Sequence, residues 1–385
     1  MNCHLVPVPR ETGYSSEQYT VALRRSTDYV RHCMPISRSN VRGKRPSKTA
    51  HSSHELFPET RAWAHGDFTS VEICAGAGGQ ALGLEAAGFE HAALVEIDCH
   101  AQNTLSLNRP NWNVTRNGDV RHFSATPFRG IELLAGGVPC PPFSKAGKQL
   151  GDKDERDLFP EAIRLVEEAR PQAVMLENVR GLLDDVFSDY REKIVSDLKS
   201  LGYRGEWKLL QASDYGVPQL RPRVVFVAIR KAAAKDFSWP IKATTPAPTV
   251  GEALFDLMAA RGWRSAKSWR EKASSIAPTL VGGSKKHGGP DLGPTRAKRA
   301  WEALGVDGKG IADLPPERDF SGIPRLTVRM AARIQGFPDS WQFSGGKTAM
   351  YRQIGNAFPP PVAAAVGHRI REALEAAASR RVKKG

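Results

Sequence analysis

The sequence predicts an α/β fold with a mostly parallel sheet, and two features of its middle portion support this. Between Phe68 and Arg230, short apolar runs alternate with helical patterns, as in SVEICA, QALGLEAAG, HAALVEI and REKIVSDLKSLG. Strands and helices in turn are typical of a sheet covered by helices on both faces. A glycine-rich turn follows the first apolar run, as in Rossmann-like nucleotide-binding folds.

The 385 residues are enough for two to three domains. Residues 1–66 have a basic composition with little apolar periodicity and predict a flexible extension. An α/β domain is expected over 67–230. Residues 231–324 break the alternation with Pro, Gly, Trp and basic residues, and predict a smaller irregular domain. Residues 325–385 return to helical core composition and are expected to dock on the first domain.

Charge is distributed unevenly along the chain. There are 55 Lys and Arg against 41 Asp and Glu, a net charge of +14. The 67–230 segment alone is acidic, whereas the three flanking segments are basic. This pattern indicates a polyanionic partner bound outside the central segment, although a basic surface kept for solubility is an alternative.

Several protein classes are disfavoured by the composition. The five cysteines include no C-x-x-C pair, which argues against a disulfide framework or a zinc site, so no metal is expected. No apolar stretch approaches the length of a membrane span, and the first residues do not resemble a secretory signal. We expect a cytoplasmic protein associated with the nucleoid if its partner is DNA.

The first strand and its turn, VEICAGAGG, indicate a nucleotide site. Gly76, Gly78 and Gly79 allow the backbone to approach a ligand at a helix N-terminus. Glu96 follows about twenty residues later, where a carboxylate binds ribose hydroxyls, and Asp119 is expected at the end of the next short strand, facing an adenine amine. A tight turn without ligand, and acids that only cap helices, are the alternatives.

Cys140 is the candidate nucleophile. It stands in GGVPCPP after an apolar strand, and the prolines on both sides restrict the loop that presents it. An isolated cysteine is more often a small buried apolar residue, which is the interpretation for Cys3, Cys33 and Cys99.

A series of motifs in this order resembles the cytosine-5 DNA methyltransferases of bacterial restriction-modification systems. The resemblance covers about residues 68–230 and 325–365. The motifs are EICAGAGG, VEID, GDV, GGVPCPPFSKAGK, RDLF, ENV, SDYGVPQLRPRVVFVA, RLTVRMAARIQGFPDSW and YRQIGNAFPP.

The resemblance implies a class I methyltransferase fold, S-adenosylmethionine as cofactor, and a defined set of catalytic residues. Cys140 adds to carbon 6 of a flipped cytosine, and carbon 5 then attacks the methyl group. Glu177 binds or protonates ring nitrogen 3, and Arg223 binds the carbonyl oxygen. Asn178 orients the nucleophile loop, and Arg221 supports Arg223.

By the same resemblance, cofactor contacts fall on eleven residues: Cys74, Gly76, Gly78, Gly79, Glu96, Ile97, Asp119, Val120, Leu158, Asn356 and Phe358. Three positions depart from the common pattern. Cys74 replaces a Phe, Ile97 replaces a frequent aromatic residue, and Pro141 replaces a Gln after the nucleophile. The first two weaken stacking on adenine without removing a polar contact.

The 231–324 segment corresponds in position to the target-recognition domain of the family. Its basic residues are interleaved with Trp263, Trp269 and Trp301, and GGSKKHGG resembles a loop that enters a DNA groove. Two lysines of the loop after the nucleophile are added to the predicted DNA contacts, since this loop has the composition of a mobile lid. The predicted DNA-binding residues are Lys145, Lys148, Thr279, Lys285, Lys286 and Arg296.

These features predict a site-specific methyltransferase acting on carbon 5 of cytosine in double-stranded DNA. A cognate restriction endonuclease acting on the same site without a stable complex, and a monomeric state, are expected from the family. An RNA cytosine-5 methyltransferase, a catalytically silent DNA-binding regulator and a nicotinamide dehydrogenase are the alternatives. The intact Cys140, Glu177 and Arg223 argue against a silent regulator.

Overall fold

The computed structural model describes residues 68–139, 157–283, 289 and 291–382. Its centre is one six-stranded sheet with the strand order β2-β1-β3-β4-β6-β5. Strands β1 to β4 run parallel to one another, and β6 runs antiparallel to both of its neighbours. The strands are β1 (Thr69–Ile73), β2 (Glu90–Val95), β3 (Leu133–Gly137), β4 (Ala173–Val179), β5 (Tyr203–Gln211) and β6 (Pro222–Arg230).

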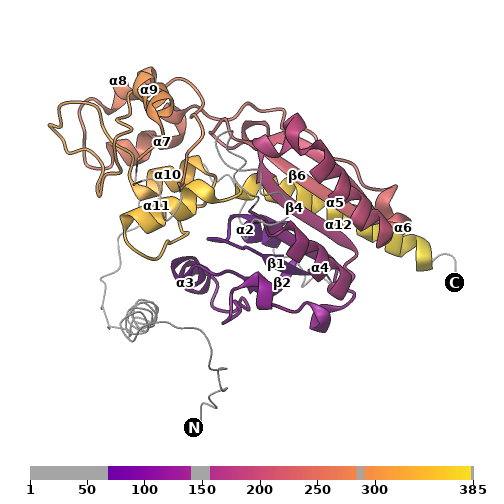
Figure 1. Cartoon of the computed structure of the whole chain (residues 1–385). Helices are drawn as coiled ribbons and strands as arrows, with labels where there is room; N and C mark the ends of the chain where they lie inside the picture. Colours follow the sequence, from indigo (N-terminus) through magenta and orange to yellow (C-terminus); the bar gives the residue numbers. More distant parts are fainter. Residues whose placement is uncertain (1–67, 140–156, 284–288, 290, 383–385) are drawn as a thin grey trace, which may run out of the picture. The chain divides into compact units, whose positions relative to one another are not determined.

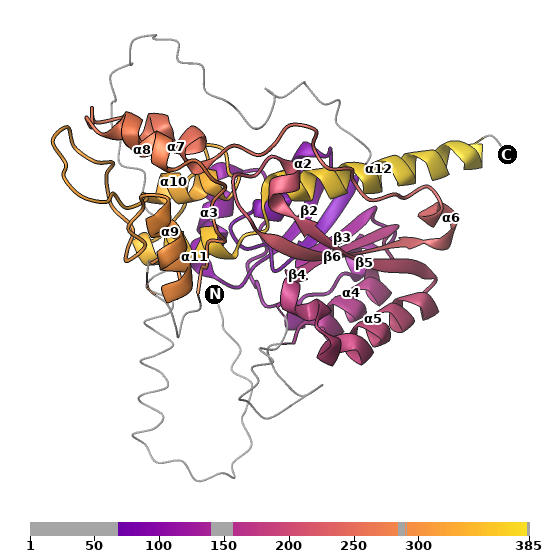
Figure 2. The same ribbon diagram turned by 90° about the horizontal axis from the view of Figure 1, so that it is seen from above.

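Helices cover both faces of this sheet (Figures 1 and 2). Helices α4 (Phe159–Ala169) and α5 (Ser188–Ser200) share one apolar cluster with the strands. Helices α2 (Gly79–Ala86) and α12 (Pro360–Val382) share another. Because both faces are buried, the inner strands β3, β4 and β6 consist largely of apolar residues, and this is why the sequence predicted them well. The predicted α/β class with a mostly parallel sheet is confirmed.

Two local expectations were wrong. The 203–211 segment was not predicted as a strand, because the edge strand β5 exposes alternate residues and carries charges where the inner strands are apolar. The short strand expected before Asp119 is reduced to an isolated bridge between Val114 and Leu94. Asp119 instead begins the 3-10 helix η1 (Val120–His122) and caps it with its side chain.

A third apolar cluster lies in the part of the chain after β6. Trp263, Trp269 and Trp301 are buried in it, so the tryptophans interleaved with basic residues form a core and are not a surface for stacking on bases. Helices α10 and α11 add to this cluster, whereas α12 packs on α2 and the sheet. The helices of this part are α6 (Lys231–Ala234), α7 (Val250–Ala259), α8 (Ala266–Lys272), α9 (Thr295–Ala303), α10 (Val328–Ile334) and α11 (Lys347–Asn356).

Helix α3 (Cys99–Asn108) follows β2, and the Asp98 side chain caps its first turn. Among the described residues, no helix is both long enough and apolar enough to cross a membrane. The predicted extension over 1–66 lies outside the described residues, and the domain boundaries stay predictions.

Candidate active site

A cavity of about 670 Å³ opens at the carboxyl ends of the parallel strands. Ligands bind at this edge in open α/β sheets. All predicted cofactor residues except Gly78 line this cavity, and Glu177 and Pro139 line it too. The ten are Cys74, Gly76, Gly79, Glu96, Ile97, Asp119, Val120, Leu158, Asn356 and Phe358.

The glycine-rich turn needs its glycines for two different reasons. Gly76 and Gly78 have φ angles of 54° and 86°, which residues other than glycine rarely adopt. At Gly79, an added Cβ atom would stand 2.3 Å from the carbonyl oxygen of Phe358. The turn therefore packs directly against the segment that follows α11. Cys74, just before the turn, also has a positive φ of 52°, and burial raises the pKa of its thiol.

Glu96 holds the turn in place from the neighbouring strand. One carboxylate oxygen accepts the backbone N–H of Gly76 at 2.7 Å, and the other accepts that of Asp98 at 2.7 Å. Burial raises the pKa of Glu96, and the two N–H donors partly oppose this shift. The carboxylate thus has a fixed position on the cavity wall, with further lone pairs for a ligand.

Asp119 lines the cavity and also forms an ion pair with Arg121. Its carboxylate accepts the Nε of Arg121 at 2.9 Å and its Nη2 at 2.7 Å. This pairing with Arg121 is the main cause of the lowered pKa of Asp119. An adenine amine at this position would share the carboxylate with Arg121.

Two buried polar side chains of the cavity were missed by the sequence analysis. Glu72 in β1 is fully buried and Gln80 in α2 nearly so, and both line the cavity. Within the described part of the chain, neither carboxylate oxygen of Glu72 and neither amide atom of Gln80 has a hydrogen-bond partner. Burial, and then the nearby Glu96, raise the pKa of Glu72 well above its ordinary value. The available signal was a charged residue inside an otherwise apolar strand.

Buried polar groups without partners are rare, and here they point to a ligand with matching groups. An α-amino acid portion would supply ammonium donors to Glu72 and a carboxylate to the Gln80 amide. Together with the Glu96 carboxylate and the close backbone turn, these residues fit an adenosine cofactor that carries an amino acid. S-adenosylmethionine has this structure.

Glu177, which lines the cavity, and Arg223, which does not, form a buried ion pair. They lie on β4 and β6, which are paired antiparallel, and Arg223 Nε is 2.8 Å from Glu177 Oε1. The side chains are only 10% and 11% exposed. Burial raises the pKa of Glu177, and the positive charge of Arg223 opposes this shift. A raised pKa makes the proton-donating form of the carboxyl more accessible.

Asn178 contacts the segment just before the predicted nucleophile. Its Nδ2 donates to the carbonyl oxygen of Val138 at 2.7 Å, and its Oδ1 accepts the N–H of Val179. Cys140 itself lies outside the described residues, as do Lys145 and Lys148 in the loop that follows.

Arg221 does not line the cavity but is buried behind it. Its guanidinium donates to the carbonyl oxygens of Leu280 at 2.7 Å, Gly355 at 2.6 Å and Ala357 at 3.1 Å. These three carbonyls come from two segments that are distant in sequence. Burial lowers the pKa of Arg221, and the nearby charge of Arg223 adds to this. Arg221 therefore joins the start of β6, the 280 segment and the end of α11.

The predicted DNA contacts are only partly placed. The Thr279 hydroxyl donates to the carbonyl oxygen of Leu220 at 2.6 Å, next to the junction made by Arg221. Asn356 Nδ2 donates to the carbonyl oxygen of Gly283, so this predicted cofactor residue also touches the 279–283 segment. Arg296 is exposed on α9. Lys285 and Lys286 lie outside the described residues.

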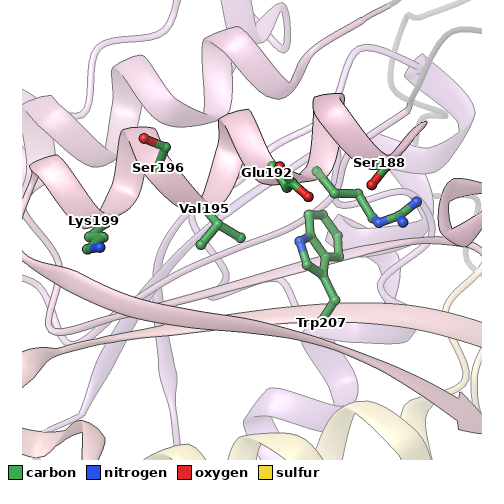
Figure 3. A pocket seen from close by; sticks show the side chains of 7 residues that line it. Ser188, Glu192, Val195, Ser196, Lys199 and Trp207 are labelled. Atoms are coloured by element: carbon green, nitrogen blue, oxygen red, sulfur yellow. The ribbon is translucent and has the colours of Figure 1, made fainter. Parts of the chain in front are cut away.

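A second hollow lies between α5 and β5, where Trp207 faces the helix (Figure 3). It contains none of the predicted site residues. In the described part of the chain, no group of three or more His, Cys, Asp or Glu residues is arranged to hold a metal ion. Most of the predicted site residues that the structure describes line the larger cavity instead.

Comparison with known proteins agrees with this geometry. The profile of the C-5 cytosine-specific DNA methylase family matches residues 68–372. The chain is 60% identical over 311 residues to type II methyltransferase M.NgoMIV of Neisseria gonorrhoeae, a match that covers 80% of this chain and 98% of that protein. It is 59% identical over 310 residues to type II methyltransferase M.NaeI of Lentzea aerocolonigenes, covering 79% and 75%.

The fold is similar to that of a prophage-encoded E. coli protein described as a DNA modification methyltransferase. The TM-score is 0.59 at 25% identity, and the match covers 80% of this chain and all of the other. The S. pombe Dnmt2 methyltransferase shares the fold with a TM-score of 0.54 at 18% identity, covering 80% and 99%.

Proposed function

Because the chain belongs to the C-5 cytosine-specific DNA methylase family, we propose that its cavity seats the methyl donor beside a cytosine bound at Glu177 and Arg223. The observation that carries this proposal is that Glu177 lines the same cavity as the glycine-rich turn and Glu96. Donor and acceptor sites are therefore continuous. Such proximity converts a reaction between two molecules into one within a single complex.

The cofactor of this family, S-adenosylmethionine, supplies an electrophilic methyl group when bound. Glu96 would hold the ribose hydroxyls from its fixed position, and Asp119 the adenine edge. Glu72 and Gln80 would satisfy their unpaired atoms on the ammonium and carboxylate groups of the amino acid portion. The remaining predicted contacts would enclose the cofactor from β1, α2 and the end of α11.

For the acceptor, we assign Cys140 as nucleophile on the grounds of sequence. Its thiolate would form a bond to carbon 6 of cytosine while the protonated Glu177 donates its proton to ring nitrogen 3. Carbon 5 would then be nucleophilic and take the methyl group, with the donor's S–CH3 bond breaking and its electron pair staying on that sulfur. A water molecule would take the carbon 5 proton, cleavage of the C6–S bond would release the Cys140 thiolate, and the proton on ring nitrogen 3 would return to Glu177, which restores the aromatic ring. Arg223 would bind the ring carbonyl oxygen, and Asn178 would fix the backbone preceding Cys140.

The reaction requires an unstacked base, so duplex DNA would be bound with its cytosine flipped into the cavity. The basic 231–324 segment would contact the DNA, through Thr279 and Arg296 among the described residues. We further propose a monomer bound to the nucleoid in the cytoplasm. A restriction endonuclease cutting the same sequence would be its functional counterpart, as in type II systems.

A methyl-transfer assay with tritiated S-adenosylmethionine tests this function. Plasmid DNA, tRNA and buffer are offered to the full chain, and we expect label in the plasmid only. Label in tRNA would favour an RNA methyltransferase. DNA binding without label would favour a silent regulator. A duplex with 5-fluorocytosine at the target site should trap a denaturant-stable adduct on Cys140, and its absence under turnover conditions would overturn the covalent route.

A further inference from the structure

Trp341 is buried behind the glycine-rich turn without lining the cavity. It follows α10 and belongs to the apolar cluster that also contains the tryptophans of the 231–324 segment. Its indole Nε1 donates to the carbonyl oxygen of Ala77 at 3.1 Å. Ala77 stands between Gly76 and Gly78 in the turn and lines the cavity. The Trp341 side chain, which belongs to this apolar cluster, thus hydrogen-bonds to the backbone of the glycine-rich turn.

The indole ring also touches the next residue of the turn. A Cβ atom built on Gly78 would stand 2.8 Å from Cδ2 of Leu105 and 2.9 Å from Cζ2 of Trp341, so these two side chains occupy the space that a side chain would need. Gly78, the one predicted cofactor residue that does not line the cavity, thus allows the turn to pack against Trp341 and Leu105.

Surrounding groups fix the position of the ring. The guanidinium carbon of Arg109 lies 5.4 Å from the ring centroid, and Arg109 is paired with Glu85 of α2 at 2.8 Å. The rings of Trp112 and Phe337 lie at centroid distances of 6.0 and 6.2 Å. The indole N–H is therefore presented to Ala77 from a position set in advance.

The peptide unit between Ala77 and Gly78 needs such a constraint. Because it adjoins glycines, it has several accessible orientations of low steric cost. In the observed orientation, the Ala77 carbonyl faces Trp341 while the Gly78 N–H donates to the carbonyl of Ala75 at 3.1 Å. A flip of this unit would break both hydrogen bonds and change the cavity wall.

From these contacts we infer that Trp341 is a positioning residue for the cofactor turn, acting from the apolar cluster that it shares with Trp263, Trp269 and Trp301. The inference rests on the proposed function, since it assigns the turn to S-adenosylmethionine. Trp341 does not line the cavity, and its role is to hold the turn in the backbone conformation that the cofactor binds. Preorganisation of this kind appears in affinity for the ligand.

Two Phe substitutions separate this role from simple packing. Trp341→Phe keeps an aromatic ring and removes the N–H that reaches Ala77. Trp301→Phe removes an equally buried indole from the same cluster, and the Trp301 N–H has no hydrogen-bond partner within the described residues. The control therefore loses similar apolar volume without changing the turn.

Binding of S-adenosylmethionine to the full chain would be measured by calorimetry. The loss of one buried hydrogen bond is worth about a 5- to 10-fold change in an equilibrium constant. We expect Trp341→Phe to raise the Kd and KM for the donor about 5- to 10-fold, while kcat at saturating donor and the Kd for DNA alone change less than about 2-fold. Trp301→Phe should lower the melting temperature and leave the donor Kd within about 2-fold.

An unchanged donor Kd in Trp341→Phe, or an equal increase in Trp301→Phe, would overturn the inference. Should Trp341→Phe fail to fold, Trp341→Met supplies a second variant that has no N–H or O–H donor, with the same expected rise in Kd. The wild-type chain distinguishes the two levels of the argument. If it binds no S-adenosylmethionine, the proposed function is wrong, whereas normal binding with no effect of the variants refutes only the role of Trp341.

Discussion

Glu177→Gln is the substitution that tests the acceptor site most directly, because it has separate expected effects on stability and on rate. The variant keeps the size of the side chain and an acceptor oxygen for Arg223, but the buried guanidinium loses its counter-charge. Removing one partner of a buried pair costs about 3–5 kcal/mol. Since Gln retains a hydrogen bond and burial already disfavours the Glu177 carboxylate, we expect a loss of about 2–3 kcal/mol in the free energy of unfolding.

The rate should fall much further than this destabilisation explains. An amide does not protonate ring nitrogen 3, and the loss of general acid catalysis lowers kcat about 10²- to 10⁴-fold. Because burial raises the pKa of Glu177, its acid form decreases as the pH rises through that pKa. The wild-type rate should therefore decline on the alkaline side of this pKa. The rate of the Glu177→Gln variant should not show this decline at alkaline pH.

Urea denaturation and tritium transfer over a pH series would measure the two effects. The matched control is Glu206→Gln, an exposed carboxylate on the edge strand β5, which should change neither. A Glu177→Gln enzyme within 10-fold of the wild-type rate, or with the same alkaline limb, would refute the assignment of Glu177 as the acid.

Three further predictions concern the free energy of unfolding, measured by urea denaturation. Gly78→Ala should cost about 2–4 kcal/mol, since its Cβ would meet an indole ring at a φ of 86°, whereas Gly76→Ala, with open space around its Cβ position, should cost only about 1–2 kcal/mol of backbone strain. Equal costs would contradict the packing argument. Arg221→Met should cost about 3–5 kcal/mol, because three backbone carbonyl oxygens lose their donor, and a cost below about 1 kcal/mol would show that the junction holds without it. Burial lowers the pKa of His91 from 6.5 to about 4, so the stability that its neutral form contributes is present above pH 6.5 and about 3 kcal/mol is lost as the pH falls to about 4. His91→Gln should remove this pH dependence.

The structure also fixes the tautomer of His91. Its Nε2 lies 2.9 Å from the carbonyl oxygen of Ala81, which only accepts, so Nε2 carries the proton. Its Nδ1 then accepts from the hydroxyl of Ser70 at 2.9 Å. Protonation of Nδ1 would reverse this second bond, with the Ser70 hydroxyl oxygen accepting, so the lowered pKa of His91 follows from burial of the ring.

The inner part of the fold was predictable because its sequence signals are local. A strand buried on both faces is largely apolar, and β3, β4 and β6 satisfy this. β1 is an exception, since Ser70 and Glu72 are buried beside Val71 and Ile73. Edge strand β5 has the period-2 pattern of a half-exposed strand, interrupted by charges, and it was missed. The short strand expected before Asp119 is represented only by the isolated bridge between Val114 and Leu94.

The cavity residues also fall into two groups, those that the local sequence identified and those whose role is visible only in the folded structure. The glycines and Glu96 were identified because turn, strand end and spacing are properties of one short stretch of chain. Glu72 and Gln80 were missed, since a buried residue without a partner is a property of the folded environment. The tryptophans of the 231–324 segment were left without a role, because composition does not distinguish a basic face from the core beneath it.

Arg221 and Trp341 show why a residue's role in this protein depends on contacts that span the chain. Both are buried outside the cavity, and each hydrogen-bonds to backbone carbonyls of segments that line or adjoin it. Arg221 joins the end of α11, which carries Asn356, to the 280 segment, and Trp341 joins the apolar cluster of Trp263, Trp269 and Trp301 to the turn after β1. It follows that losing the hydrogen-bonding group of Arg221 or Trp341 should weaken donor binding although neither side chain lines the cavity. Loosening the same cluster at Trp301, which makes no hydrogen bond to the turn within the described residues, should lower stability without this loss of affinity.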